Sequence, residues 1–312
     1  MKVSVIITTY NRPLQLQRAY DSVVNQTRMP EEIIIIDDAS DNIVAESLKQ
    51  KRGLAQSEAL RDRETITIIK RFATSQGACK ARNTGAAIAT GDIIMFLDDD
   101  DTWEPQKIIA QLKIFDSNPQ IGLVYSGKLI VKETEREKIL YQVTPKAKGN
   151  LYPAILYDNL IGSTSSVAMK KKLFQQVDGF DEKMPALQDY DLWIRCCKQT
   201  IIGHDNSCNL RYTIAEKPYY QISGQAHRQI NAVKIISEKY HTEITKQGYF
   251  NARKIYAAKN FYIAKSLRSQ SLLTAIPWIL KSFFQYPNLK ITALVFPLKI
   301  TQQLRNFFSI KT

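Results

Sequence analysis

The stretch Ile93-Ile-Met-Phe-Leu-Asp-Asp-Asp-Asp101 is an apolar run that ends in four carboxylates. An uninterrupted apolar run of this kind is typical of a strand that is buried on both faces of a sheet. Four adjacent aspartates repel one another, and the repulsion grows as water is excluded. Folded proteins offset such repulsion with a divalent cation, and carboxylate oxygens suit Mg²⁺ or Mn²⁺. The alternative is a solvated acidic turn that caps the following helix.

A second stretch, Ile33-Ile-Ile-Ile-Asp-Asp38, repeats this arrangement of an apolar strand followed by acids. Around the two stretches, segments with the pattern of strands alternate with segments that have the pattern of helices. We expect strands at 3–9, 32–36, 65–70, 92–97 and 121–126, and helices at 13–25, 42–61, 77–89 and 103–116. This alternation predicts an α/β fold with a mostly parallel sheet and helices on both of its faces. Because ligands bind beyond the carboxyl ends of such strands, Tyr10 and both groups of acids are expected at one site.

The composition is that of a globular chain long enough for one large core and an appendage, or for two modest domains. Hydrophobic residues make up 44% of the 312 residues, which excludes a disordered chain. The four cysteines show no metal-binding spacing, so we expect reduced thiols and a cytoplasmic protein. Met1-Lys2 is followed at once by a strand pattern, and no signal peptide is expected.

The net charge of +13 is concentrated in the last third of the chain. From Gln221 onward there are fourteen Lys or Arg and two acids, and after Glu243 there is no acid. Aromatic residues continue among the basic ones, and the segments 271–286 and 289–308 have the pattern of amphipathic helices. This combination favours an anionic membrane surface as partner, and no nucleic acid is expected. An ordinary helical subdomain with a basic outer face is the alternative.

The sequence lacks both common nucleotide-binding loops. There is no G-x-x-x-x-G-K-[ST] and no G-x-G-x-x-G, which excludes a phosphate-cradling loop and a dinucleotide fingerprint. A nucleoside diphosphate would instead be held through a metal ion on the later acids, 98–101. The earlier acids, 37–38, would then bind the base or ribose through their acceptor oxygens.

Five motifs occur in order along residues 1–230, and together they resemble the family 2 inverting glycosyltransferases of GT-A fold. The motifs are Val3-Ser-Val-Ile-Ile-Thr-Thr-Tyr-Asn-Arg-Pro13, Ile36-Asp-Asp-Ala-Ser40, Gly77-Ala-Cys-Lys-Ala-Arg-Asn-Thr-Gly85, Phe96-Leu-Asp-Asp-Asp-Asp-Thr-Trp-Glu-Pro105, and Gly179-Phe-Asp-Glu182 with Gln188-Asp-Tyr-Asp-Leu-Trp193. The resemblance implies a GT-A domain at 1–225, with a nucleotide-sugar-binding half at 1–126 and an acceptor half at 127–225. It leaves 226–312 as a basic amphipathic helical region.

The resemblance also implies roles for single residues. The residues expected to bind the donor are Thr8, Tyr10, Arg12, Asp38, Arg82, Asn83, Asp98 and Asp99. In this set the ring of Tyr10 packs beside the base, and the carboxylate of Asp38 accepts a base N–H. The pair Asp98-x-Asp100 is similar to the family's D-x-D motif, with Asp100 as the direct metal ligand. Two alternatives stay open: Tyr10 as a core aromatic residue at the strand end, and Arg82 as a surface residue of its helix that pairs with an acid.

A further carboxylate is needed as a base, because the acceptor hydroxyl must lose its proton as the new bond forms. By the resemblance Asp189 has this role, while Asp191 lies lower on the same helix and braces it. Gln188 departs from the Glu that is frequent in the family, which removes one charge and leaves the base intact. The alternative is that Asp189 only caps the helix 190–198. An inverting transfer is a single displacement and needs no enzyme nucleophile.

These features predict an inverting glycosyltransferase that moves one sugar from a nucleotide-diphosphate sugar to a saccharide acceptor, with Mn²⁺ or Mg²⁺ as cofactor. The acceptor is expected between 128–160 and 162–166. No uncharged apolar run reaches the roughly 18 residues that span a bilayer, so peripheral attachment to the inner face of the cell membrane is predicted. That location suggests a lipid-linked glycan acceptor and assembly of a cell-surface polysaccharide. The alternatives are a metal-dependent nucleotidyl or phosphoryl transferase and a non-catalytic nucleotide-sugar-binding scaffold.

Overall fold

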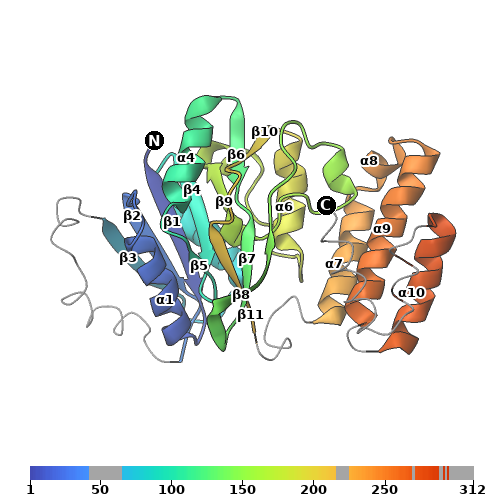
Figure 1. Ribbon diagram of the computed structural model, residues 1–312, viewed down its shortest axis with the longest axis horizontal. Coiled ribbons are helices and arrows are strands. Elements are labelled where there is room, and N and C mark those ends of the chain that lie inside the picture. The colour runs from blue at the N-terminus through green and yellow to red at the C-terminus, as the bar shows by residue number, and fades with distance from the viewer. Residues whose placement is uncertain (42–64, 216–224, 269–270, 288–290, 292–293, 295–312) are drawn as a thin grey trace. The chain divides into compact units, whose positions relative to one another are not determined.

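The computed structural model describes residues 1–41, 65–215, 225–268, 271–287, 291 and 294 (Figure 1). The chain divides into two units, and each is described by itself. The first is built from Met1–Tyr152, Asn159–Lys183 and Gln188–Glu216, and the second from Pro153–Asp158, Met184–Leu187 and Lys217–Thr312. The helix predicted at 42–61 lies outside the described residues, as do all but two residues of the helix predicted at 289–308.

A seven-stranded sheet forms the centre of the first unit. In spatial order its strands are β10 (Ile201–His204), β6 (Ile121–Tyr125), β9 (Val167–Lys170), β4 (Ile93–Asp98), β1 (Val3–Thr9), β2 (Glu32–Asp37) and β3 (Ile66–Arg71). β9 pairs antiparallel with both of its neighbours, and the other pairs are parallel. Every residue of β1 is buried, as its uncharged sequence predicts for a central strand. The predicted mostly parallel sheet is therefore confirmed.

Helices cover both faces of this sheet, as predicted. In the described part of the first unit the α-helices are α1 (Pro13–Val24), α3 (Ala78–Ile88), α4 (Lys107–Ser117), α5 (Lys171–Gln176) and α6 (Gln188–Cys197). Apolar residues of α1 and α4 share a core with Val5 and Ile7 of β1. α3 packs on the opposite face, where a Cβ on Gly85 would lie 2.5 Å from the side chain of Ile6. Glycine is required there because any larger residue would push the helix off the sheet.

A smaller sheet of four strands completes the first unit. Its order is β5 (Thr102–Trp103), β11 (Leu210–Ile214), β7 (Lys128–Lys132) and β8 (Glu135–Val143). The helix predicted from Trp103 was wrong at its start, because Trp103 lies in β5 and pairs with Leu210 of β11. Pro105 gives the physical reason, since it disfavours helical backbone at the residue before it. The buried indole of Trp103 also donates a hydrogen bond to the Ser165 carbonyl at 2.9 Å.

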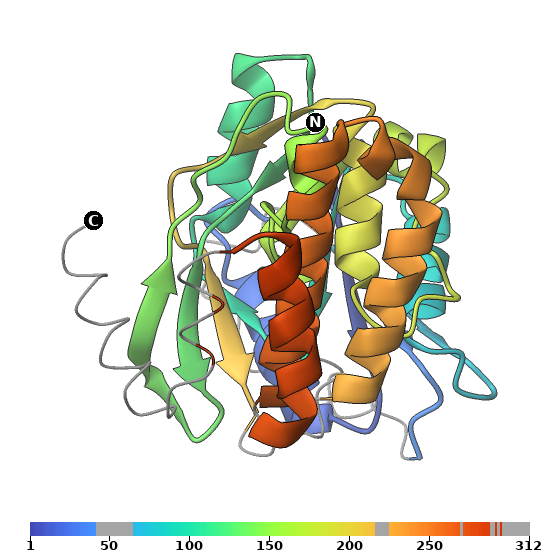
Figure 2. The ribbon, with the colours of Figure 1, turned by 90° about the vertical axis from the view of Figure 1, so that its right-hand side faces the viewer.

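The second unit is helical in its described part beyond residue 225. Its helices are α7 (Ala226–Lys239), α8 (His241–Thr245), α9 (Tyr249–Arg268) and α10 (Leu272–Gln285). α10 confirms the helix predicted at 271–286, and it lies antiparallel beside α9 (Figures 1 and 2). Among the described helices, none is both long and apolar enough to cross a membrane.

A fully buried lysine, Lys107, starts α4 beneath the small sheet. Its ammonium donates to the Ser166 carbonyl at 2.9 Å and to Oε1 of Gln111 at 3.1 Å, and it lies 5.2 Å from the centre of the Trp103 ring. Burial lowers the pKa of Lys107 to about 7, and the charge of Asp205 opposes the shift. The lysine is therefore a neutral donor above about pH 7 and a buried cation below it.

We expect Lys107→Met to change how stability depends on pH. Above about pH 7 the unfolded chain holds a proton on Lys107 that the folded chain lacks, so wild-type stability rises with pH up to the ordinary lysine pKa. The slope from this one group is at most about 1.4 kcal/mol per pH unit. Urea unfolding at several pH values above 7 should therefore show a smaller rise in the free energy of unfolding for Lys107→Met than for wild type.

The control is Lys113→Met, on the exposed side of the same helix, which should keep the wild-type rise in the free energy of unfolding. Equal pH dependence in all three proteins would contradict the assigned titration.

Candidate active site

The acids named from the sequence lie at the carboxyl ends of β2 and β4, the two strands that flank β1. In the strand register, Thr8 of β1 lies beside Asp98 of β4, and Thr9 lies beside Asp37 of β2. Parallel pairing with β1 therefore brings segments that lie about 30 and 90 residues further along the chain to the same edge of the sheet. The predicted convergence of the strand ends is confirmed.

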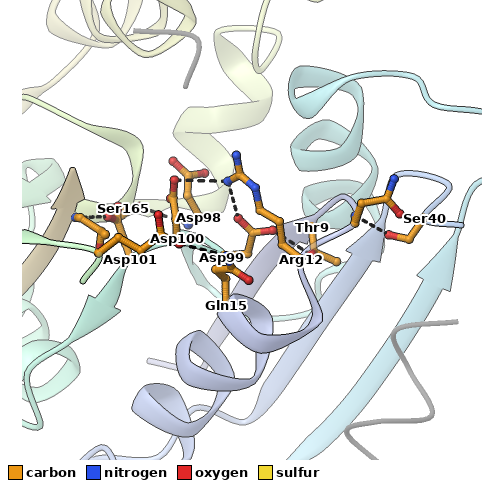
Figure 3. Close-up of polar contacts among 12 residues, drawn as sticks. Thr9, Arg12, Gln15, Ser40, Asp98, Asp99, Asp100, Asp101 and Ser165 are labelled. Atoms are coloured by element: carbon orange, nitrogen blue, oxygen red, sulfur yellow. Dashed lines mark hydrogen bonds and ion pairs between the residues drawn. The ribbon is translucent and has the colours of Figure 1, made fainter. Parts of the chain in front are cut away.

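The arginine that precedes α1, Arg12, lies against Asp99 and Asp100, which follow β4 (Figure 3). Nη1 of Arg12 lies 3.2 Å from Oδ1 of Asp99 and 3.3 Å from Oδ2 of Asp100. The hydroxyl of Thr9 donates to the other oxygen of Asp99 at 2.8 Å. Burial, followed by the charge of Asp100, raises the pKa of Asp99 to about 7, although Arg12 and Thr9 oppose the shift. Asp99 is thus a supporting carboxylate, held from two sides.

The four aspartates divide into two that are buried and two that reach solvent. The side chains of Asp99 and Asp101 are almost fully buried, whereas those of Asp98 and Asp100 are 30% and 22% exposed. Asp101 accepts from the backbone N–H of Thr213 at 3.0 Å and is also hydrogen-bonded to Ser165. Burial, with the charges of Asp100 and Asp98, raises the pKa of Asp101. Alternate residues of the run therefore present their carboxylates outward.

Arg82 of α3 forms an ion pair with Asp98. Its guanidinium is buried and lies 5.4 Å from the centre of the Phe180 ring. Burial works against the cation, but the charge of Asp98 and the hydrogen bond to it raise the pKa of Arg82. Arg82 thus pairs with an acid, as the alternative stated, but it is buried and not on the surface of its helix. The pair places a fixed positive charge beside the exposed acids.

Asp38, which follows β2, holds the start of α3. Its carboxylate accepts from the hydroxyl of Ser75 at 2.7 Å and from the backbone N–H groups of Gln76 at 2.6 Å and Gly77 at 2.9 Å. A carboxylate has about four acceptor positions, so about one is left for a ligand. Gly77 has φ of 85°, a left-handed conformation that glycine adopts without strain. Recognition of a base by Asp38 stays a prediction.

The segment after β1 presents an exposed aromatic ring. Tyr10 is 49% exposed, so the alternative interpretation of Tyr10 as a core aromatic residue was wrong. The next residue, Asn11, has φ of 54° and is tied to the loop after β2. Its backbone N–H donates to the Ser40 hydroxyl at 2.8 Å, and its side chain exchanges two hydrogen bonds with Asp41. Thr8 lies buried on the strand, and its own predicted contact with the donor stays a prediction.

The amide of Asn83 is engaged by the chain around Phe180. It accepts from the backbone N–H of Phe180 and donates to the same residue's carbonyl, both at 2.9 Å, and it donates to Glu182 at 3.0 Å. The amide therefore fixes the loop before α6 against α3. Its predicted contact with the donor is an untested prediction, and most of its hydrogen-bonding capacity is already used.

Asp189 lies in the first turn of α6, which begins one residue earlier at Gln188. The helix does not start at residue 190 as the capping alternative required, and Oδ1 of Asp189 accepts from the adjacent N–H of Tyr190 at 2.7 Å. Burial raises the pKa of Asp189, while the hydrogen bond from Tyr190 and the charges of Lys128 and Arg82 oppose the shift. Asp191, fully buried, is braced by Arg195 at 2.9 Å.

Three residues of the site were not singled out by any motif, although all three lie in the segments 128–160 and 162–166 between which the acceptor was expected. Lys128 starts β7, and its ammonium lies 5.1 Å from the centre of the Tyr212 ring. The same ammonium interacts electrostatically with the carboxylates of Asp189 and Asp101. Ser165 accepts from the backbone N–H of Asp98 at 3.1 Å, in addition to its bond with Asp101. Arg136 of β8 donates to the Asp100 carbonyl at 3.2 Å. Lys128 and Arg136 come from β7 and β8 and Ser165 from the turn before β9, so each reaches the site only through the tertiary fold.

The exposed acids fit a divalent cation that has further ligands from a substrate. Asp98 and Asp100 are two oxygen donors on one side of the turn, and Mg²⁺ is held by one or two carboxylates together with substrate phosphates. No group of three or more His, Cys, Asp or Glu able to hold a metal ion occurs among the described residues. The donor set thus fits a cation shared with a diphosphate and does not form a closed protein site.

Comparison with known proteins identifies relatives along most of the first unit. Residues 4–178, more than half of the chain, match the family described as Glycosyl transferase family 2. A glycosyltransferase of Haemophilus influenzae is 31% identical over 198 residues, which cover 63% of this chain and 62% of that protein. The chain therefore spans less than two thirds of the length of that relative.

Two solved structures share the fold. S. aureus TarS 1–349 in complex with UDP has a TM-score of 0.56 at 16% identity, over 95% of this chain and 90% of that one. A mannosyltransferase from Pyrobaculum calidifontis, solved with GDP-Man and Mn²⁺, has a TM-score of 0.55 at 17% identity, over 94% and 78% of the two chains. At these identities the likeness concerns the fold alone. The predicted GT-A fold is confirmed.

Proposed function

Because the chain belongs to glycosyltransferase family 2, we propose that it moves one sugar from a nucleotide-diphosphate sugar to a saccharide acceptor with inversion. The observation that carries the proposal is the meeting of three groups at one end of the sheet. These groups are the outward acids Asp98 and Asp100, the fixed cation of Arg82, and a carboxylate at the start of α6, Asp189. They are the parts that a single displacement requires.

Asp189 takes the proton of the acceptor hydroxyl as that oxygen attacks the anomeric carbon. Its buried setting supports this role because burial raises the pKa of the carboxyl toward the working pH of a base. The positive charges of Lys128 and Arg82 oppose this upward shift of the Asp189 pKa. Removal of the acceptor's proton and departure of the nucleoside diphosphate complete the step, with no covalent sugar–enzyme bond.

The donor is held at the ends of β1, β2 and β4. Tyr10 offers an exposed ring on which a base stacks, and Asp38 has acceptor capacity left for one base N–H. Asp98 and Asp100 would hold Mn²⁺ or Mg²⁺, which supplies charge stabilisation to the leaving diphosphate when it is bound. Arg12 and Arg82 hold the acids in place beside it.

The acceptor is proposed to be a lipid-linked glycan at the cytoplasmic face of the cell membrane, in assembly of a cell-surface polysaccharide. Support comes from the basic, aromatic region 226–312, in which no acid follows Glu243. Such a region is suited to lie peripherally on an anionic surface. An enzyme held there meets its lipid-linked acceptor in two dimensions instead of three.

A donor screen tests the proposed reaction. We expect one of a panel of UDP-, GDP- and dTDP-sugars to release its nucleoside diphosphate with Mn²⁺ or Mg²⁺ present, and chelator to stop the release. The measurement is coupled detection of nucleoside diphosphate, run beside detection of pyrophosphate. Release of pyrophosphate would identify a nucleotidyl transferase instead. Metal-dependent binding of a nucleotide sugar without turnover, with saccharide acceptors supplied, would identify a scaffold.

A further inference from the structure

Five aromatic side chains are exposed at one end of the pair α9 and α10. Tyr249 and Phe250 begin α9 and are 67% and 81% exposed. Phe283, Phe284 and Tyr286 end α10, and they are 37%, 70% and 40% exposed. We refer to these five residues as the aromatic end. Scattered apolar residues are ordinary on a protein surface, but five aromatic rings at one helix-pair end are not.

The two halves of the aromatic end are joined by an arginine. Nε of Arg253, one turn into α9, donates to the carbonyl of Gln285 at 2.9 Å, and its Nη2 donates to the carbonyl of Phe284 at 2.6 Å. Nη1 donates to the Tyr249 hydroxyl at 2.8 Å. These bonds satisfy carbonyls that the end of α10 leaves unpaired. Segments more than 30 residues apart in sequence are thereby held as one fixed surface.

The aromatic end does not belong to the core of the second unit. That core lies toward the other end of the pair, where Ala264 of α9 packs with Ala275 and Ile279 of α10. The rings instead contact one another, with centroids 5.5 Å apart for Tyr249 and Phe250. Their exposure is therefore not required to close the core, and it costs solvation free energy that a partner would recover.

Positive charge surrounds the aromatic end. Lys246, Lys254 and Lys281 are exposed, and the ammonium of Lys254 lies 5.7 Å from the centre of the Tyr286 ring. No acid follows Glu243 in the sequence. One acid from an earlier segment of the same unit, Asp158, interacts with the Tyr157 ring that Lys254 also contacts, so the three lysines still outnumber it. Aromatic rings at the level of the headgroups and lysines facing anionic lipid are the two features of an interfacial membrane contact.

We propose that the aromatic end enters the headgroup region of an anionic phospholipid bilayer and is the main point of attachment to it. The inference rests on the membrane location proposed above, and it names the surface that makes the contact. The rings of Phe250 and Phe284 lose contact with water on insertion, while Lys246, Lys254 and Lys281 pair with lipid phosphates. The charge pattern favours a bilayer over a second copy of this chain, which would bring lysines against lysines.

Co-sedimentation with vesicles tests this assignment. The full-length protein is mixed with vesicles of phosphatidylcholine alone or with phosphatidylglycerol added. We expect binding to the anionic vesicles, and a loss of about tenfold or more in partition coefficient for Phe250→Ser combined with Phe284→Ser. Leu273→Ser is the control, since Leu273 is 78% exposed at the opposite end of α10 and should leave binding unchanged.

The outcomes separate this inference from the proposed function. If wild type bound and the double variant bound equally well, the aromatic end would not be the site of membrane contact. Membrane attachment by another part of the protein would still be supported. No binding of wild type to anionic vesicles would overturn both, while the donor screen in solution would still judge the transfer reaction. Equal loss in Leu273→Ser would mean that general hydrophobicity, and not this surface, governs binding.

A second measurement avoids variants that alter folding. Phe250→Trp and Leu273→Trp each keep an apolar side chain and add one fluorophore. The first lies in the aromatic end, at the start of α9, and the second lies at the start of α10. We expect brominated lipid to quench the added fluorescence of Phe250→Trp, relative to wild type, and not that of Leu273→Trp. Equal quenching of the two would overturn the proposed orientation.

Discussion

Asp189→Asn is expected to lower kcat by about a thousandfold, the range of a lost general base, and to leave donor affinity within about twofold. The reason is that only the proton acceptor is removed. Asn keeps the oxygen that accepts the N–H of Tyr190, so α6 should start at the same residue. The measurement is nucleoside diphosphate release at saturating donor and acceptor, with donor binding measured separately by calorimetry.

A matched control shows whether the effect belongs to Asp189. Asp178 is an exposed aspartate before α6 with φ of 58°, a backbone conformation that Asn also tolerates. Asp178→Asn makes the same chemical change outside the site and should retain wild-type turnover. If Asp189→Asn kept more than about a tenth of wild-type kcat, Asp189 would not be the base.

The pH profile gives a second view of the same carboxylate. Burial raises the pKa of Asp189, so the acid limb of kcat/KM should lie above the ordinary titration range of an aspartate. Asp189 is active when deprotonated, so activity is expected to fall as pH is lowered through this pKa. The limb should be absent from the residual activity of Asp189→Asn.

Asp100→Asn is expected to weaken Mn²⁺-dependent donor binding by more than about tenfold and to lower turnover at least in proportion. Asp100 is one of the two outward carboxylates, and Asn supplies a neutral, weaker ligand for a hard cation. The measurement is Mn²⁺ binding in the presence of nucleoside diphosphate, followed by electron paramagnetic resonance, which does not depend on turnover.

The same variant should not lose stability. The charge of Asp100 contributes to the raised pKa of both Asp99 and Asp101, so its removal relieves repulsion within the run. This gain offsets the loss of the partly exposed ion pair with Arg12, which keeps Asp99 as a partner. Urea unfolding should therefore find Asp100→Asn at least as stable as wild type. Asp116→Asn, an exposed change at the end of α4, is the control for Mn²⁺ binding. Unchanged Mn²⁺ binding in Asp100→Asn would remove Asp100 from the metal site.

The candidate site was predictable where it follows directly from strand ends. Asp98 and Asp38 terminate apolar runs, and parallel pairing with β1 then fixes their neighbourhood. The helix start at Trp103 was mispredicted because a helical pattern in the sequence competes with strand pairing to β11, which only the folded chain offers. Pro105 carried the correct signal, since it marks the residue before it as extended or turn-like.

The α/β fold, the parallel pairing around β1 and the acids at its edge were predictable from local composition, because burial on two faces and strand–helix alternation are local properties of the chain. Which acids face outward, the burial of Arg82 against Asp98 and the electrostatic interaction of Lys128 with Asp189 became known only from the folded chain. The tertiary structure also gathered the aromatic end, from residues at 249–250 and 283–286. These features depend on distances between segments remote in the chain, which packing of whole elements fixes and no local pattern encodes.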